Sequence, residues 1–424
     1  MKEAERPATK RGDAYRPAHH SCEANLVAHS SRIVLTAARL ATPLASIENA
    51  VVVIRDGRIE ALGPREAVAI PAGAPVTDFG DRLLAPGLVD LHIHGGAGRD
   101  VMEGDGDALA AIEALLARHG VTSYYPTTVT APLDAILRAL DKLGRAIAAG
   151  AGREPEPGRA QRLGIHLEGP FLSHARRGVH PTENLLAPTP ALLERLWQAA
   201  QGQIRIVTIA PELPGAAETI AAATRLGIRC SLGHSDADLA AARAGIEAGA
   251  RQATHTFNAM PPLDHRVPNL LTAVLSDARV RAELIADGIH VHPLVVQLLL
   301  RSKGVEGVML ITDGISATGM PEGRYRLGPL EVEVRDGTCT YEGKLAGSVL
   351  TLDRAVRNIV KFAGWPLEQA LRLATVNPCA AMGLSGGQGA LQAGGPADLV
   401  ALTRDGEVVE TIVGGRRAPA PAVA

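Results

Sequence analysis

The 424-residue chain has few cysteines, few aromatic residues and no long apolar run. Its four cysteines, Cys22, Cys230, Cys339 and Cys379, form no CxxC pair, which argues against a disulfide scaffold or a cysteine-type zinc site and favours a reducing, cytoplasmic location. Aromatic residues make up 3% of the chain, which argues against stacking platforms for single-stranded nucleic acid. No apolar run approaches the length of a membrane span.

A charge excess of either sign is also lacking. The 43 Lys+Arg residues are matched by 45 Asp+Glu residues, so no global positive field is available to hold nucleic acid or an anionic membrane. Residues 1–30 are polar and charged, without the apolar core of a secretory signal. We interpret them as a disordered N-terminal extension.

The length exceeds that of one typical domain and predicts a large domain with a smaller one. Residues 31–85 alternate β-rich runs with turns such as Asp56-Gly57. Residues 385–424 show the same alternation of β-rich runs and turns, with a turn at Asp405-Gly406, and end in a tail. We therefore expect the two chain ends to form one small β-sandwich domain together.

Residues 86–384 alternate strand-like segments with alanine-rich helical segments that end at or beside glycine. Eight strands are expected, at 88–94, 121–126, 163–168, 204–210, 228–233, 252–256, 281–287 and 308–313. Eight such units close a (β/α)₈ barrel, so the predicted fold class is α/β with a TIM-like barrel. An insertion at 320–346, which turns at Asp336-Gly337, is predicted to be a β-hairpin or meander.

Histidines and acids follow directly on the apolar runs of these expected strands. The set comprises His92, His94, Glu168, His234, His255, His290 and Asp313. Metal-ligand residue types at the carboxyl ends of barrel strands are how this architecture builds a hydrolytic centre. The pattern therefore predicts an enzyme.

Glu168, His234 and His255 together form a set of two histidines and one carboxylate, which leaves a coordination position open for water. Glu168 ends a buried run, so its carboxylate needs either a metal or a charge partner. The alternative to a metal is a salt bridge to an arginine such as Arg176 or Arg177.

His92 and His94 are two residues apart in one expected strand, so both imidazoles can face one metal. The alternative is that they cap the barrel interior. Asp313 ends the eighth strand, where it can take a proton from water and pass it to a leaving group. Its alternative role is that of a helix N-cap in TDGIS.

Over residues 31–415 the chain resembles the amidohydrolase superfamily and, within it, the N-acetylglucosamine-6-phosphate deacetylase family. The resemblance rests on PGLVDLHIHG, HLEGPF, GVHPTEN, SLGHSDA, THTFNAMPPL, ADGIHV, ITDGISATGM, LAGS and PADLV. It implies metal-dependent hydrolysis of the acetamido group of N-acetyl-D-glucosamine 6-phosphate to glucosamine 6-phosphate and acetate. Alternatives are the galactosamine isomer, another amidase substrate, and a catalytically dead barrel that serves as a scaffold.

The resemblance also implies roles for particular residues. Glu168, His234 and His255 match the ligands of the main divalent metal, zinc or iron(II). His92 and His94 match a second metal site that some members have, so one or two ions per chain are implied. Asp313 matches the catalytic acid/base, and His180 matches the residue that polarises the acetamido carbonyl.

Contacts with the phosphorylated sugar are implied for a further group of residues. They are Val179, His180, Asn258, Ala259, Arg266, His290, Leu345, Ala346 and Gly347. Arg266 looks like a residue supplied to the neighbouring active site across a homodimer interface. A guanidinium on a loop flanked by Pro262 and Pro268 suits a phosphate, because its fork of donors matches the phosphate oxygens.

Overall fold

The computed structural model describes residues 32–42 and 45–418. The expected N-terminal extension, including Cys22, lies outside the described residues. Within them, none of the helices is both long and apolar enough to cross a membrane.

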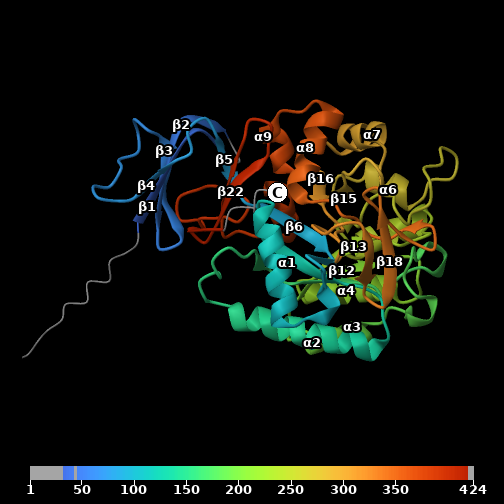
Figure 1. Cartoon of the computed structure of the whole chain (residues 1–424). Coiled ribbons are helices and arrows are strands. Elements are labelled where there is room, and N and C mark those ends of the chain that lie inside the picture. Colours follow the sequence, from blue (N-terminus) through green and yellow to red (C-terminus); the bar gives the residue numbers. More distant parts are fainter. Residues whose placement is uncertain (1–31, 43–44, 419–424) are drawn as a thin grey trace, which may run out of the picture. The chain divides into compact units, whose positions relative to one another are not determined.

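Eight parallel strands form the barrel, and helices surround them (Figure 1). The strands are β6 (Leu88–Ile93), β9 (Val121–Thr128), β11 (Ile165–Glu168), β12 (Ile204–Ile209), β13 (Arg229–Leu232), β14 (Gln252–Ala253), β15 (Arg281–Ile285) and β16 (Val308–Ile311). They pair in this order, and a parallel bridge between Ile93 and Gly314 joins the last strand region to the first. The short β10 (Gln161–Arg162) also pairs with β9. The predicted α/β barrel is thereby confirmed.

The barrel strands are buried along almost their whole length, because helices cover the outer face and side chains fill the inside. The helices are α1 (Gly106–Arg118), α2 (Leu133–Gly150), α3 (Pro190–Ala199), α4 (Ala216–Arg225), α5 (Leu239–Ala248), α6 (Leu270–Ser276), α7 (Pro293–Lys303), α8 (Leu352–Ala363), α9 (Leu367–Arg372) and α10 (Val376–Met382). In α8 the buried residues Leu352, Ala355, Val356 and Ile359 recur at helical spacing, which gives the helix one face for the core. Short 3₁₀ turns are η1 (Val101–Glu103), η2 (His174–Arg176) and η3 (Thr182–Asn184).

The two chain ends meet in a separate sheet, as the sequence predicts. Its strands are β1 (Arg32–Ala41), β2 (Ser46–Arg55), β3 (Arg58–Pro64), β4 (Val76–Asp78), β5 (Leu83–Pro86), β21 (Leu399–Leu402), β22 (Val408–Val413) and β23 (Arg416–Arg417). Strand β5 pairs with β21, which places Leu84 opposite Ala401. Asp56 and Gly57 join β2 to β3 with φ angles of 50° and 74°, as a tight hairpin requires.

The predicted insertion is a four-stranded antiparallel meander of β17 (Gly323–Leu327), β18 (Leu330–Arg335), β19 (Thr338–Tyr341) and β20 (Lys344–Leu345). It turns at Asp336-Gly337, as expected. A small apolar cluster packs Leu327, Val332 and Ala346 against Val129 and Val179 of the barrel loops. A two-stranded ribbon, β7 (Gly95–Gly96) with β8 (Arg99–Asp100), lies directly after β6.

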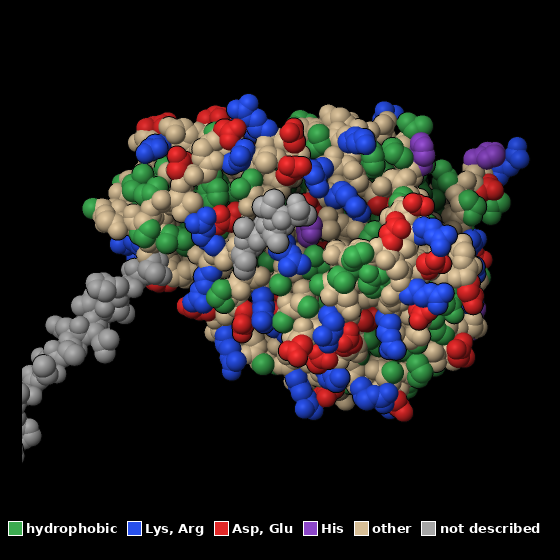
Figure 2. All heavy atoms as spheres, viewed as in Figure 1, with side chains coloured by type: hydrophobic (Ala, Val, Ile, Leu, Met, Phe, Trp, Pro, Cys, Tyr) green, Lys and Arg blue, Asp and Glu red, His purple; other side chains and the backbone are tan. Residues whose placement is uncertain are grey.

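Positive and negative side chains are intermixed on the face shown in Figure 2. No large area of one sign covers this face, in line with the near-zero net charge of the chain.

Candidate active site

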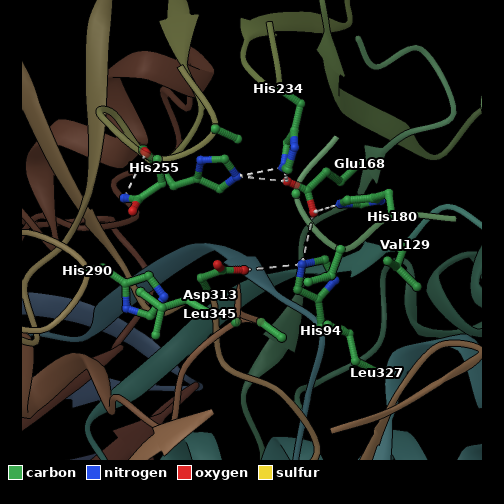
Figure 3. A pocket seen from close by; sticks show the side chains of 16 residues that line it. His94, Val129, Glu168, His180, His234, His255, His290, Asp313, Leu327 and Leu345 are labelled. Carbon is green, nitrogen blue, oxygen red and sulfur yellow. Dashed lines mark hydrogen bonds and ion pairs between the residues drawn. The ribbon is translucent and has the colours of Figure 1, made fainter. Parts of the chain in front are cut away.

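Histidines and acids from six strand ends converge on one cavity at the carboxyl side of the barrel (Figure 3). His94 comes directly after β6, and Glu168 is the last residue of β11. His234, His255 and Asp313 follow β13, β14 and β16 after one intervening residue. These three have φ angles of 46°, 28° and 50°, in the left-handed region that side chains other than glycine rarely adopt. Such strain is typical of functional sites.

One oxygen of Glu168 faces His234 and His255. Oε1 lies 3.3 Å from His234 Nε2 and 3.2 Å from His255 Nε2, and the two nitrogens are 3.0 Å apart. Donor atoms around a tetrahedral ion with bonds of about 2.1 Å are about 3.4 Å from one another. The three predicted ligands therefore have the spacing of a metal site.

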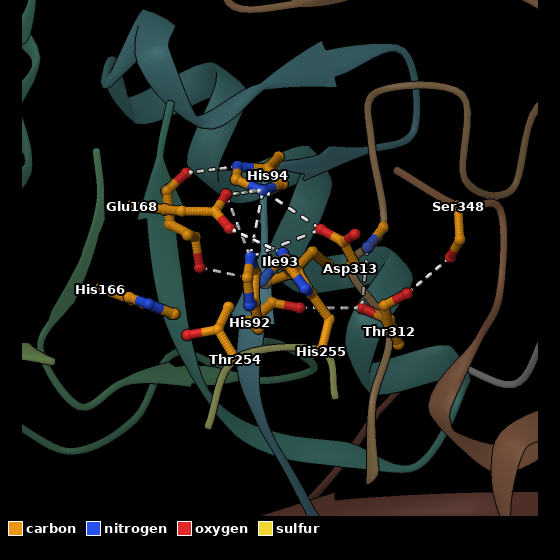
Figure 4. A network of polar contacts seen from close by, with 12 residues as sticks. His92, Ile93, His94, His166, Glu168, Thr254, His255, Thr312, Asp313 and Ser348 are labelled. Carbon is orange, nitrogen blue, oxygen red and sulfur yellow. Dashed lines mark hydrogen bonds and ion pairs between the residues drawn. The ribbon is translucent and has the colours of Figure 1, made fainter. Parts of the chain in front are cut away.

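The other oxygen of Glu168 faces His92 and His94 (Figure 4). Oε2 lies 3.4 Å from His92 Nε2 and 3.0 Å from His94 Nε2, which are 3.2 Å apart. Asp313 Oδ1 lies 3.4 Å and 3.2 Å from the same two nitrogens. Glu168 thus stands between two donor sets, with one oxygen toward each.

The ring orientations show which histidine nitrogens are free to bind a cation. His94 Nδ1 lies 3.2 Å from the Thr127 carbonyl, and His234 Nδ1 lies 3.0 Å from the Arg176 carbonyl. A carbonyl only accepts, so Nδ1 carries the proton and Nε2 presents a lone pair. Lone pairs that face a neighbouring nitrogen at about 3 Å repel unless a proton or a metal cation lies between them. The donors therefore fit a divalent metal.

Asp313 is buried but is held in its charged form. Burial opposes ionisation, yet His92 and His94 outweigh it and hold the pKa of Asp313 well below its ordinary value. No helix begins at Asp313, so the alternative role of a helix N-cap is wrong. The carboxylate can accept a proton from a group in the cavity.

His180 is a neutral hydrogen-bond donor at the cavity. Burial, together with neighbouring His234, lowers the pKa of His180 to about 3. The Thr130 backbone N–H donates to His180 Nδ1 at 3.4 Å, and the Thr130 hydroxyl lies 2.8 Å from the same atom. Nδ1 is therefore the acceptor, and Nε2 carries the proton.

The cavity includes most of the residues predicted to contact a sugar. Val179, His180, Asn258, Ala259, His290, Leu345, Ala346 and Gly347 line it, together with Val129, Gly178 and Leu327, which sequence reasoning did not single out. Leu327 and Leu345 come from the meander and make part of the wall apolar. Asn258 donates its side-chain amide to the His255 carbonyl at 3.2 Å.

Arg266 is the one predicted contact that does not line the cavity. It is exposed on its loop, where Asp264 Oδ1 accepts the backbone N–H of Arg266 at 2.7 Å and of Val267 at 2.9 Å. The described chain alone therefore does not bring its guanidinium to the site.

The proposed alternative partners of Glu168 are engaged elsewhere. Arg176 pairs with Asp236 at 2.7 Å, and Arg177 donates to the His180 carbonyl at 2.6 Å. The ion pairs of Glu168 in the described residues are with histidines alone. The salt-bridge interpretation of Glu168 is therefore wrong.

A layer of buried polar residues beneath the cavity was missed by sequence reasoning. Asp90 accepts the Thr312 hydroxyl at 2.6 Å and the His92 N–H at 3.2 Å. Glu283 Oε2 lies 3.3 Å from His92 Nδ1. The available signal was an acid inside an apolar strand, in LVDLHI and in RAELI, because an acid there needs a partner.

Known proteins match this chain over most of its length. The model of the amidohydrolase family matches residues 83–418. An N-acetylgalactosamine-6-phosphate deacetylase of Escherichia coli O157:H7 is 40% identical, covering 87% of this chain and 94% of that protein. An N-acetylglucosamine-6-phosphate deacetylase of Vibrio furnissii is 38% identical, covering 87% and 90%.

Solved structures agree in fold. A mutant N-acetyl-D-glucosamine-6-phosphate deacetylase of Mycobacterium smegmatis, in complex with N-acetyl-D-glucosamine-6-phosphate, has a TM-score of 0.84 at 37% identity and covers 92% of this chain and 99% of its own. The deacetylase of Thermotoga maritima has a TM-score of 0.81 at 31% identity, covering 92% and 100%. The chain belongs to the amidohydrolase family and, within it, to the family of N-acetyl amino sugar 6-phosphate deacetylases.

Proposed function

We propose that this enzyme hydrolyses the acetamido group of N-acetyl-D-glucosamine 6-phosphate to glucosamine 6-phosphate and acetate. The observation that carries the proposal is the placement of Glu168, Asp313 and a neutral His180 on one cavity with two pairs of facing histidines. This combination supplies a cation site, a base and a hydrogen-bond donor for amide hydrolysis.

Glu168, His234 and His255 would hold the main divalent metal, for which we propose zinc, with iron(II) as the ion of similar ligand preference. Such an ion, when bound, lowers the pKa of water to about 7 and polarises a carbonyl. The scaffold alternative requires a broken ligand set, and the distances of 3.3 Å and 3.2 Å from Glu168 Oε1 to His234 and His255 argue against it.

The residues of the chain then perform the proton transfers. Asp313 accepts a proton from the water that attacks the acetamido carbon. His180 keeps its proton and donates a hydrogen bond from Nε2–H to the carbonyl oxygen, where negative charge develops. As the C–N bond breaks, Asp313 returns the proton to the sugar nitrogen, so that acetate and the amine leave.

Binding of the sugar phosphate is assigned to the rest of the cavity. Asn258, Ala259, Val179 and the turn from Leu345 to Gly347 would contact the sugar, and His290 the phosphorylated end. We propose that the protein is a homodimer in which Arg266 reaches the phosphate in the neighbouring cavity. Its exposure and its absence from the cavity lining of its own chain support this role.

Acetate release by the purified protein tests the proposal. The protein is freed of metal with a chelator, reloaded with Zn²⁺ or Fe²⁺, and assayed with the 6-phosphates of N-acetylglucosamine and N-acetylgalactosamine and with unphosphorylated N-acetylglucosamine. We expect the glucosamine phosphate to give the highest kcat/KM. A preference for the galactosamine isomer, which the Escherichia coli relative makes a specific second candidate, would reassign the substrate. No acetate from either phosphate would refute the function.

A further inference from the structure

We propose that Val129 and Leu327 close the acyl end of the cavity, the part beside His180, and restrict the substrate to an acyl group no larger than acetyl. Both are apolar side chains that line the cavity, and they are only 2% and 3% exposed. The inference rests on the proposed function, because it names the part of the amide substrate that these two residues would contact.

The position of Val129 in the chain places it beside the group that polarises the carbonyl. Val129 directly precedes Thr130, whose backbone N–H and hydroxyl lie 3.4 Å and 2.8 Å from His180 Nδ1. In the proposed reaction His180 Nε2 donates a hydrogen bond to the carbonyl oxygen of the amide. The acyl chain is bonded to the same carbonyl carbon, so its first carbon also lies close to this segment.

The three substituents of the carbonyl carbon face different parts of the cavity. The oxygen faces His180, and the nitrogen carries the sugar toward His290. In Figure 3, Val129 and Leu327 lie on the side of the cavity opposite His290. The acyl chain is the apolar substituent, and this apolar wall is the surface that suits it.

The backbone on either side of Leu327 is fixed by hydrogen bonds. Arg326, which precedes it, donates its N–H to the Ser316 hydroxyl at 3.1 Å. Gly328, which follows it, donates its N–H to Asp100 Oδ2 at 2.7 Å. Leu327 is therefore held against the barrel from both sides.

Val129 is packed tightly against the same turn. A Cβ at Gly328 would lie 2.2 Å from Val129 Cγ1, so glycine is required there. Behind the wall, Val332 and Ile315 belong to the same apolar cluster and are fully buried. Side chains in such a core have no free space into which to move. An acyl chain with one more carbon would therefore collide with the wall.

The kinetics of N-acetyl- and N-propionyl-glucosamine 6-phosphate test the acyl end. Both substrates release the same amine, so one amine assay gives kcat/KM for each. In the wild type we expect kcat/KM to be about 10–200-fold lower for the propionyl substrate, the usual effect of one extra methylene group. Leu327→Ala and Val129→Ala enlarge the acyl end, and each should reduce this difference about tenfold.

Val332→Ala is the matched control, because Val332 is buried in the same apolar cluster but does not line the cavity. It should leave the ratio of the two kcat/KM values as in the wild type, even where it lowers the melting temperature as much as Leu327→Ala does. If Leu327→Ala does not fold, Leu327→Val takes its place and should shift the ratio in the same direction.

Equal kcat/KM for both substrates in the wild type, or a wild-type ratio in the Leu327 and Val129 variants, would overturn the inference. An equal change of the ratio in Val332→Ala would do so too, since it would indicate a general loosening of the meander. In each case amine release leaves the proposed function standing. Amine release from neither substrate would refute the function, and the ratio of the two dissociation constants in the same variants, measured by calorimetry, then decides the role of the acyl end by the same criterion.

Discussion

His290 Nδ1 lies 2.7 Å from Asp287 Oδ2, and both side chains are almost completely buried. Asp287 Oδ1 also accepts the backbone N–H groups of Ile289 and His290 at 2.8 Å, which forms a tight turn after β15. The carboxylate keeps the proton of the ring on Nδ1. Nε2 is therefore the nitrogen that His290 can offer to a ligand in the cavity.

Replacing Asp287 by asparagine should weaken substrate binding while leaving chemistry almost intact. Asparagine can still accept the two backbone N–H groups, but it loses the charge-assisted bond to His290. We expect KM for the phosphorylated sugar to rise about tenfold with kcat nearly unchanged. Steady-state kinetics measure both quantities. Asp105→Asn, which changes a helix-capping carboxylate at α1, should leave KM at the wild-type value.

The acid/base assignment predicts a different kinetic signature for Asp313. Asp313→Asn keeps the shape of the side chain but cannot accept a proton, so kcat should fall by about 10²–10⁴-fold. The ion held by Glu168, His234 and His255 should remain bound. Zinc content and turnover are measured on the same preparation, and near-wild-type turnover would show that another group is the base.

His180 should matter chiefly in the transition state. His180→Gln removes a neutral donor held in place by Thr130, and we expect kcat to fall by about 10²–10³-fold with a small change in KM. The exposed His174 on the same loop is the matched control, and His174→Gln should behave as the wild type. A change confined to KM would instead assign His180 to ground-state binding.

Asp398 is a buried acid that does not line the cavity, and its pKa predicts how the free energy of unfolding depends on pH. Burial raises the pKa of Asp398 to about 6, and its partners Gly414 N–H and Gln161 only partly oppose this. The pKa of Asp398 in the folded state lies above its unfolded value of about 4. The contribution of Asp398 to the free energy of unfolding is therefore fully present below pH 4 and is lost as the pH rises through 6.

Asp398→Asn should remove that loss. Above pH 6 we expect it to melt about 2 °C higher than the wild type, with the difference vanishing near pH 4. Thermal melts across this pH range measure it. Asp78→Asn is the opposite control, because the Gly80 N–H and the Thr36 hydroxyl lower the pKa of Asp78, so this variant should gain nothing at neutral pH.

The elements that could be predicted from sequence are those with strong local signals. Asp56-Gly57, Asp336-Gly337 and Asp405-Gly406 each mark an observed hairpin. In the first two, both residues have the left-handed backbone that a tight turn requires, and in the third Gly406 alone has it. The barrel strands were also recognisable as short apolar runs. The ends of these strands were harder to recognise from sequence. Strand β14, for example, ends at Ala253, and the backbone has turned sharply by His255.

The layer beneath the cavity could not be predicted in the same way. Asp90 and Glu283 are far apart in sequence, and both contact His92. Barrel closure brings them together, and no local pattern encodes that distance. The role of Arg266 stays a prediction for a similar reason, because its expected ligand lies in a second subunit.

The pairing of β5 with β21 has a consequence for biosynthesis. When Leu84 leaves the ribosome, its strand partner around Ala401 has not yet been translated. The N-terminal strands therefore keep one edge unpaired until the whole barrel has been synthesised. Completion of this sheet is a late event in vectorial synthesis, and the nascent chain is most exposed to edge-to-edge aggregation during that interval.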